Sequence, residues 1–134
     1  MKRILVSACL IGLPTRYNGK DAKREEVLKL AEGECLLPLC PEQLGGLPTP
    51  RPRATLSGGK VVNEEGEDVT ENFLRGAGMV VELCKKLGIK KAILKEGSPS
   101  CGVNFTNVDW ERIPGKGILA EMLENEGIEI EGVE

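Results

Sequence analysis

The sequence contains no histidine among its 134 residues. This absence excludes the catalytic triads that use an imidazole as general base, and it excludes every zinc site with an imidazole ligand. Acid–base chemistry near neutral pH must therefore come from carboxylates, thiols, lysines or bound water.

Aromatic residues and long apolar runs are scarce as well. One tyrosine, one tryptophan and two phenylalanines do not make a stacking platform for single strands, and a net charge of −3 gives no bias toward nucleic acid. We therefore expect no direct nucleic-acid binding. No apolar run approaches the ~18 residues needed to span a bilayer, so no membrane partner is expected.

The first residues, 1–14, superficially resemble a signal peptide, with two basic residues before an apolar stretch. However, Ser7, Cys9 and Gly12 interrupt that stretch, and no small-residue cleavage site follows it. We interpret the segment as a first buried strand and expect a cytoplasmic protein.

The apolar segments alternate between the patterns of strands and helices. Strands are expected at 3–8, 34–40, 90–96 and 128–133, and helices at 21–32, 68–88 and 114–127. Residues 41–67 are expected to be irregular, with a small hairpin or turn excursion. This order predicts an α/β fold: a single compact Rossmann-like domain over 1–134, with a mostly parallel sheet flanked by helices.

Two helix starts carry capping signals. Asp21 is expected to cap the first predicted helix, and Asp68 with Glu71 resembles a capping box at the start of the second.

Five cysteines are present, an odd number, and an intracellular chain is not expected to hold them in disulfides. Cys9, Cys40 and Cys101 each lie at or just past the end of a predicted strand. Because the loops at the carboxyl ends of parallel strands gather at one edge of the sheet, we expect these thiols to converge. Cys35 lies within a strand and Cys84 on an apolar helix stripe, which is typical of buried structural cysteines.

Three converging thiolates can hold zinc or a cubane iron–sulfur cluster, with one position left open in either case, and their softness excludes calcium and magnesium. The cysteine spacing matches no standard metal signature, so core packing near strand ends is an alternative. The stretches "SACLIG" and "SPSCG" favour a ligand, because backbone N–H groups among small residues can point at a sulfide or an anion.

Polar side chains near the three thiols can assist chemistry at the open position. Glu42, Ser98 and Ser100 are the candidates, because a carboxylate and a hydroxyl beside a metal can relay protons and position water. Glu42 could instead cap a helix or pair with Arg51. Both serines could be turn residues around Pro99.

Three loop arginines, Arg16, Arg51 and Arg53, raise the hypothesis of an anion site for a nucleotide phosphate or a carboxylate. The alternative for each is an ordinary solvated side chain.

Several motifs together carry a family resemblance that runs nearly end to end. They are "VSACLIG", "TRYNGK", "CPEQLGGLPTPRP", "GGKVV", "GEDVTENFLRGA", "KKAILKEGSPSCG" and "GKGILAEMLENEGIEI". The chain resembles the family known as domain of unknown function 523, which includes the thiouracil desulfidases. It departs from that family's pattern at Asn18 and in the segment 103–114.

The resemblance implies a compact α/β fold and a [4Fe–4S] cluster with one free iron, held here by Cys9, Cys40 and Cys101. The free iron is expected to take the sulfur of a thiocarbonyl substrate such as 2-thiouracil, without net electron transfer. Glu42 is then the acid–base residue, with Ser98 as its helper and Ser100 as the second choice. Such a cluster can be lost in preparations made in air, and zinc is the lesser alternative.

Two further classes of function stay open at this point. One is a non-catalytic protein that stores or transfers sulfide or a cluster. The other is a structural metal domain, or a metal-free small-molecule-binding α/β module. An open coordination position beside Glu42 favours an enzyme, whereas a fourth protein ligand would favour a structural domain.

Overall fold

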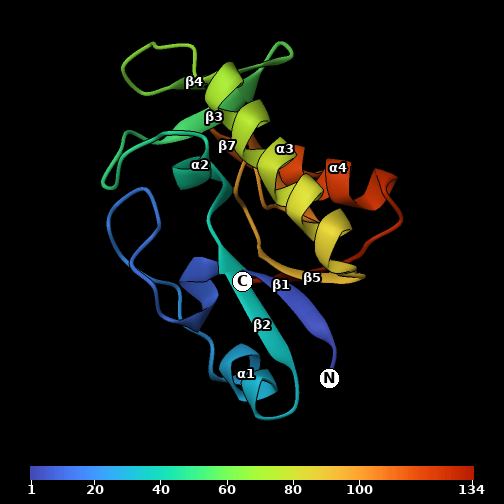
Figure 1. Ribbon diagram of the computed structural model, residues 1–134. Helices are drawn as coiled ribbons and strands as arrows, with labels where there is room; N and C mark the ends of the chain where they lie inside the picture. Colours follow the sequence, from blue (N-terminus) through green and yellow to red (C-terminus); the bar gives the residue numbers. More distant parts are fainter.

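The computed structural model describes residues 1–134 and contains two four-stranded sheets (Figure 1). The first sheet has the order β2-β1-β5-β8, and all its neighbouring strands are parallel. Its strands are β1 (Arg3–Ser7), β2 (Cys35–Leu39), β5 (Lys91–Lys95) and β8 (Glu129–Val133). The predicted α/β fold with a mostly parallel sheet is confirmed, and each of these strands lies within a segment predicted as a strand.

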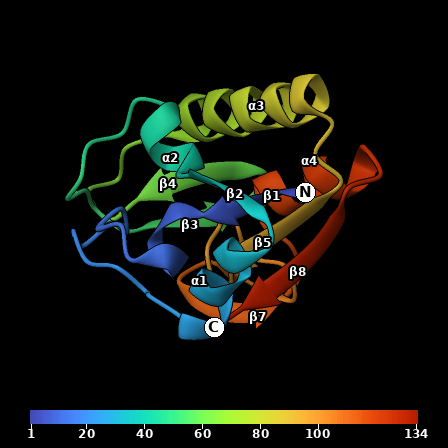
Figure 2. The same cartoon turned by 60° about the horizontal axis from the view of Figure 1, so that its bottom comes forward.

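Helices cover both faces of this sheet (Figure 2). Along β1, Leu5 packs into a core with α3 (Thr70–Leu87) and α4 (Ile118–Asn125). Ile4 and Val6 pack on the opposite face, near the 3₁₀ helix η1 (Ala8–Ile11) and α1 (Glu25–Leu28). Burial on both faces explains why β1 reads as a continuous apolar run and not as an alternating one.

The long helix α3 follows its predicted stripe. Its buried residues recur every three or four positions: Phe73, Gly76, Ala77, Val80, Val81 and Cys84. The helix ends at Gly88, whose φ of 67° is the left-handed conformation that glycine adopts most easily. The predicted capping box is wrong, because the Asp68 carboxylate accepts the Thr70 N–H at 2.9 Å in a turn that precedes the helix.

The first predicted helix is shorter than expected. Residues 21–24 are not helical, and the helical turns are α1 followed by the 3₁₀ helix η2 (Lys29–Glu32). The backbone N–H groups of Ala22 and Arg24 donate to the carbonyls of Cys9 and Leu10, both at 2.9 Å. These tertiary hydrogen bonds hold the segment extended, so Asp21 accepts only the Lys23 N–H and does not cap a helix.

The second sheet has the order β4-β3-β6-β7 and consists of two antiparallel hairpins joined by one parallel pairing, Leu56 with Val108. Its strands are β3 (Ala54–Ser57), β4 (Lys60–Asn63), β6 (Phe105–Val108) and β7 (Glu111–Pro114). Only the first hairpin was foreseen, as a turn excursion. The second turns at Asp109 and Trp110, with φ of 49° and 69°, and therefore lacks the glycine that usually marks such a turn.

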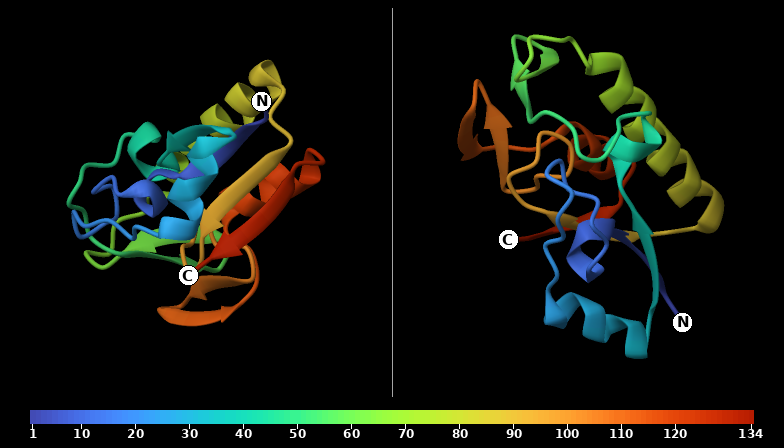
Figure 3. Two further views of the ribbon diagram at one scale, coloured as in Figure 1. Left: turned by 90° about the horizontal axis from the view of Figure 1, so that it is seen from below. Right: turned by 90° about the vertical axis from the view of Figure 1, so that its left-hand side faces the viewer.

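The two sheets bring several loops to one end of the molecule. In Figure 3 the blue loop after η1 and the green loop after α2 (Pro41–Leu44) lie at the same end, beyond the end of β2. The Arg51 N–H donates to the Tyr17 carbonyl at 2.8 Å and ties these two loops together. None of the helices is both long and apolar enough to cross a membrane.

Candidate functional site

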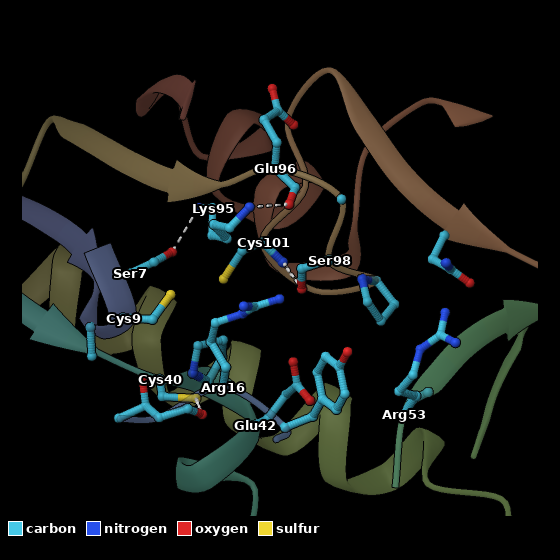
Figure 4. Close-up of a pocket in the computed structure, with 18 of the residues that line it drawn as sticks. Ser7, Cys9, Arg16, Cys40, Glu42, Arg53, Lys95, Glu96, Ser98 and Cys101 are labelled. Atoms are coloured by element: carbon cyan, nitrogen blue, oxygen red, sulfur yellow. Dashed lines mark hydrogen bonds between the residues drawn. The ribbon is translucent and has the colours of Figure 1, made fainter. Parts of the chain in front are cut away.

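A cavity of about 330 Å³ opens where β1, β2 and β5 end, and Cys9, Cys40 and Cys101 all line it. Figure 4 shows the sulfur atoms of Cys9 and Cys101 directed into this space. The structure therefore brings together the three thiols that strand topology predicted to converge. Cys84 is buried on α3 as predicted, whereas Cys35 is exposed, so its predicted burial is wrong; neither lines the cavity.

Burial disfavours ionisation of all three cavity thiols. Burial raises the pKa of Cys9 to about 11; Cys40 adds to the rise, while the positive charges of Lys95 and Arg16 oppose it. Burial likewise raises the pKa of Cys40, and it raises that of Cys101 well above the usual range. A metal centre supplies the positive charge that these thiols need to ionise together.

Cys40 is fixed by a short helix. It is the residue before α2, and Pro41 occupies the first helical position, where proline's missing N–H is not needed. This helix packs so closely on α3 that a Cβ on Gly76 would overlap the Pro41 carbonyl. The proline- and glycine-rich sequence after Cys40 thus forms a rigid support for the thiol.

Cys101 is fixed by a tight turn whose hub is Ser98. The Ser98 Oγ accepts the N–H groups of Ser100 at 3.0 Å and Cys101 at 2.9 Å. A Cβ on Gly102 would overlap the Phe105 carbonyl, so the chain can turn here only without a side chain.

Glu96 organises the same loop and was missed by sequence reasoning. Its buried carboxylate accepts the backbone N–H groups of Val103, Asn104 and Phe105 at 2.9 to 3.1 Å. Gly132 makes room for it, because a Cβ there would overlap the carboxylate. The sequence held one signal for this role. Glu96 is a charged residue that directly follows an apolar strand and directly precedes a glycine, at a strand end that is buried.

The two candidate serines lie in different surroundings. Ser98 lines the cavity, and because its oxygen already accepts two N–H groups, its own proton is free to be donated toward the cavity. Ser100 is fully buried outside the cavity lining, and its Oγ has no hydrogen-bond partner. The geometry favours Ser98 over Ser100 as the residue that can reach a ligand.

Glu42 lines the cavity and its carboxylate points into it (Figure 4). The Arg51 Nε donates to Glu42 Oε1 at 3.0 Å, with the two side chains 4% and 17% exposed. The pairing that sequence reasoning offered as an alternative for Glu42 is therefore present, in the wall of the cavity and not in solvent.

The other predicted arginines also line the cavity. Arg16 extends toward the space between Cys9 and Ser98 in Figure 4, and its guanidinium makes no hydrogen bond or ion pair with the protein. Arg53 is exposed at the rim, 5.7 Å from the centroid of the Trp110 ring. Lys95 and Arg112 add two further cations to the lining, which sequence reasoning did not single out.

The thiol set fits a cubane cluster better than a single metal ion. A structural zinc site needs four ligands at about 2.3 Å from the ion. No three His, Cys, Asp or Glu side chains are close enough to share one ion here, so the thiols do not form such a site. A cubane accepts thiolates that lie farther apart, because each binds a different iron.

Comparison with known proteins agrees with this geometry. A model of the 2-thiouracil desulfurase family matches residues 4–133. The chain belongs to this family. A relative in Bacillus subtilis (strain 168), the uncharacterised protein YbbK, is 39% identical over 140 residues, which cover 95% of this chain and 93% of the relative.

This chain is also similar to a solved protein structure. It is the [4Fe–4S]-dependent thiouracil desulfidase TudS, 42% identical, with a TM-score of 0.89 over 98% of this chain and 91% of that one. The family resemblance inferred from the motifs is therefore confirmed, and so is the fold it implied. The cluster on which TudS depends is the cofactor that the resemblance led us to expect.

Proposed function

We propose that this chain is a non-redox, [4Fe–4S]-dependent desulfidase that removes sulfur from a thiolated nucleobase or a related thiocarbonyl small molecule. The observation that carries the proposal is the convergence of Cys9, Cys40 and Cys101 on one cavity that also holds Glu42 and Ser98. Membership of the 2-thiouracil desulfurase family and the likeness to TudS support it.

The three cysteines would hold the cluster through one iron each. When bound, the cluster supplies an open iron that accepts a soft sulfur donor and polarises a C=S bond. Cys9 and Cys101 are buried in the cavity wall and Cys40 is half-buried, which limits the access of water to the sulfur ligands; the turns around Ser98 and α2 fix their directions.

The protein's own residues would carry the proton transfers. Glu42 takes a proton from water as the water oxygen bonds to the thiocarbonyl carbon, and it returns that proton as the C–S bond breaks. Ser98 donates a hydrogen bond from its free hydroxyl to the substrate and orients it, and it keeps its proton. Water adds its oxygen to the carbon and the sulfur leaves with the bonding pair. The sulfur takes both protons of that water, one of them through Glu42, so a carbonyl and hydrogen sulfide form without an oxidant or a reductant.

Arg16 and Arg53 are the proposed contacts for an anionic group of the substrate, a phosphate or a carboxylate. The guanidinium of Arg16 lies 5.7 Å from the centroid of the Tyr17 ring and makes no hydrogen bond or ion pair with the protein, and Arg53 lies at the rim where a substituent of the base would extend. The proposed partner is a small molecule. All five cysteines are free thiols, which fits the reducing cytoplasm that we propose as its location.

The test is sulfide release under anaerobic conditions. The protein reconstituted with iron and sulfide should be brown and should release sulfide from 2-thiouracil over many turnovers. Glu42→Ala should keep the colour and lose the release. A brown wild type that releases no more than one sulfide per chain would instead indicate a cluster or sulfide carrier, and a colourless one would overturn the cluster assignment.

A further inference from the structure

Arg51 contacts two parts of the site at once, although its side chain is only 4% exposed. Its Nε donates to Glu42 Oε1 at 3.0 Å. Its Nη2 lies 3.8 Å from Cys40 Sγ and donates to the Thr15 carbonyl at 3.0 Å. One guanidinium therefore joins the proposed acid–base residue, a proposed cluster ligand and the loop that carries Arg16.

The remaining side of the guanidinium is also occupied. Nη1 donates to Thr49 Oγ1 at 2.9 Å and to the Pro48 carbonyl at 3.3 Å. A guanidinium has five N–H donors, and these five contacts use one each. Arg51 thus has no donor left for a substrate anion, which distinguishes it from Arg16.

We infer that Arg51 is a positioning residue: it holds the Glu42 carboxylate toward the cavity and donates a hydrogen bond to the Cys40 sulfur that raises the reduction potential of the cluster. The inference rests on the proposed function and replaces the anion-binding role that the sequence suggested for Arg51.

The physical reasons for the two effects are separate. Glu42 accepts one hydrogen bond from a guanidinium whose planar fork of donors is fixed by its other contacts, so the carboxylate loses rotational freedom and stays aimed at the place where water must attack. A hydrogen bond to a ligating sulfur withdraws charge from it and favours the reduced cluster, and a nearby positive charge acts in the same direction. A flexible lysine would keep the charge but lose the fork.

The experiment compares Arg51→Met, Arg51→Lys and Arg53→Met in the anaerobically reconstituted protein. The first measurement is the midpoint potential of the cluster. Arg51→Met should lower the potential relative to wild type, and Arg51→Lys should lower it less. Arg53→Met, which removes a charge from the rim without any contact to Cys40, should shift it less than Arg51→Met. An unchanged potential in Arg51→Met, or an equal shift in Arg53→Met, overturns the hydrogen bond to Cys40.

The second measurement is a double-mutant cycle on sulfide release from 2-thiouracil. Arg51→Met alone should lower kcat roughly 10–100-fold with little change in KM, the usual cost of losing a residue that orients a ligand or base. In a Glu42→Gln background it should lower the residual kcat little further, because the two residues act as one unit. If the kcat losses of the two single variants multiply in the double variant, Arg51 does not act through Glu42 and the positioning role is overturned.

The two measurements also separate this inference from the proposed function. A wild-type protein that binds the cluster but releases no sulfide contradicts the desulfidase proposal, while the shift in potential is still measured on the same samples. Arg51→Lys, read by its potential and its thermal midpoint, serves if Arg51→Met does not fold, because it keeps the buried positive charge beside Glu42.

Discussion

Gly76 in α3 lies directly against the carbonyl of Pro41 in α2, with no room for a Cβ between them. A second close approach lies one turn away, where a Cβ on Gly45 would overlap the backbone of Asn72. Because α2 directly follows Cys40 and contains Glu42, the position of both site residues depends on a helix–helix contact that only glycine permits.

The first prediction compares two glycines of α3. Gly76→Ala should destabilise the protein by about 1–3 kcal/mol, because the added methyl group forces α2 away from α3. Gly78→Ala should stabilise it by about 0.5–1 kcal/mol, since nothing lies within 4 Å of that Cβ and alanine favours the helix. Urea unfolding of the apo-protein measures both.

The same pair tests the link from packing to the site. Gly76→Ala should also bind less iron per chain after reconstitution, because α2 displaces Cys40, whereas Gly78→Ala should bind as much as wild type. Equal stability and equal iron content in the two variants would contradict the proposed role of the contact.

The second prediction concerns Glu96, whose carboxylate collects three backbone N–H groups of the loop after Cys101. Glu96→Gln should destabilise the fold by about 1.5–3 kcal/mol, because a neutral amide is a weaker acceptor than the carboxylate. The NH2 group of the glutamine would also face the backbone N–H groups of the loop, so that donors lie against donors. Glu129→Gln, at an exposed position of β8, is the control and should change stability by less than about 0.5 kcal/mol.

Thermal unfolding followed by circular dichroism measures both variants. A Glu96→Gln protein as stable as the Glu129→Gln control would show that the carboxylate does not organise the loop.

Whether a feature of the fold or the site could be predicted from the sequence depends on how far apart along the chain its interacting residues lie. β1 and β5 are apolar runs, and strand order alone brought Cys9, Cys40 and Cys101 to one edge of the sheet. Those predictions needed only local patterns and one rule of topology.

Most contacts of Glu96 and Arg51 could not be predicted in the same way; only the pairing of Arg51 with Glu42 was an alternative that the sequence offered. Glu96 binds mainly backbone N–H groups of an irregular loop, and Arg51 also donates to the carbonyls of two loops. The identity of those loop residues carries no signal for these bonds. The hairpin of β6 and β7 was missed for a related reason: its turn is held by Thr55 and Ser57 of the neighbouring strand, through bonds to Trp110 N–H and the Asp109 carboxylate.

The third prediction separates the three proposed ligand cysteines from Cys35 and Cys84. Changing Cys9, Cys40 or Cys101 to serine should abolish most iron binding, because a hydroxyl does not replace a thiolate on a cluster iron. Cys35→Ser, on an exposed residue, and Cys84→Ala, in the core, should keep wild-type iron per chain.

Iron and acid-labile sulfide analysis after anaerobic reconstitution provides the readout. Cys84→Ala should lower the thermal midpoint without changing the iron content, which separates loss of packing from loss of a ligand. Full iron content in any of the three serine variants would remove that cysteine from the ligand set.

The fourth prediction distinguishes the two serines, which lie two residues apart and differ in what their hydroxyls contact. Ser98→Ala removes the acceptor of two N–H groups and a free hydroxyl proton in the cavity wall, so sulfide release from 2-thiouracil should fall at least tenfold. Ser100→Ala removes a buried hydroxyl without a partner, so stability should stay equal or rise and sulfide release should persist.

Initial rates of sulfide release, normalised to cluster content, and thermal midpoints of both variants decide between the two serines. A loss of activity in Ser100→Ala with Ser98→Ala unaffected would reverse the assignment, because it would mean that the loop turns its second serine toward the substrate.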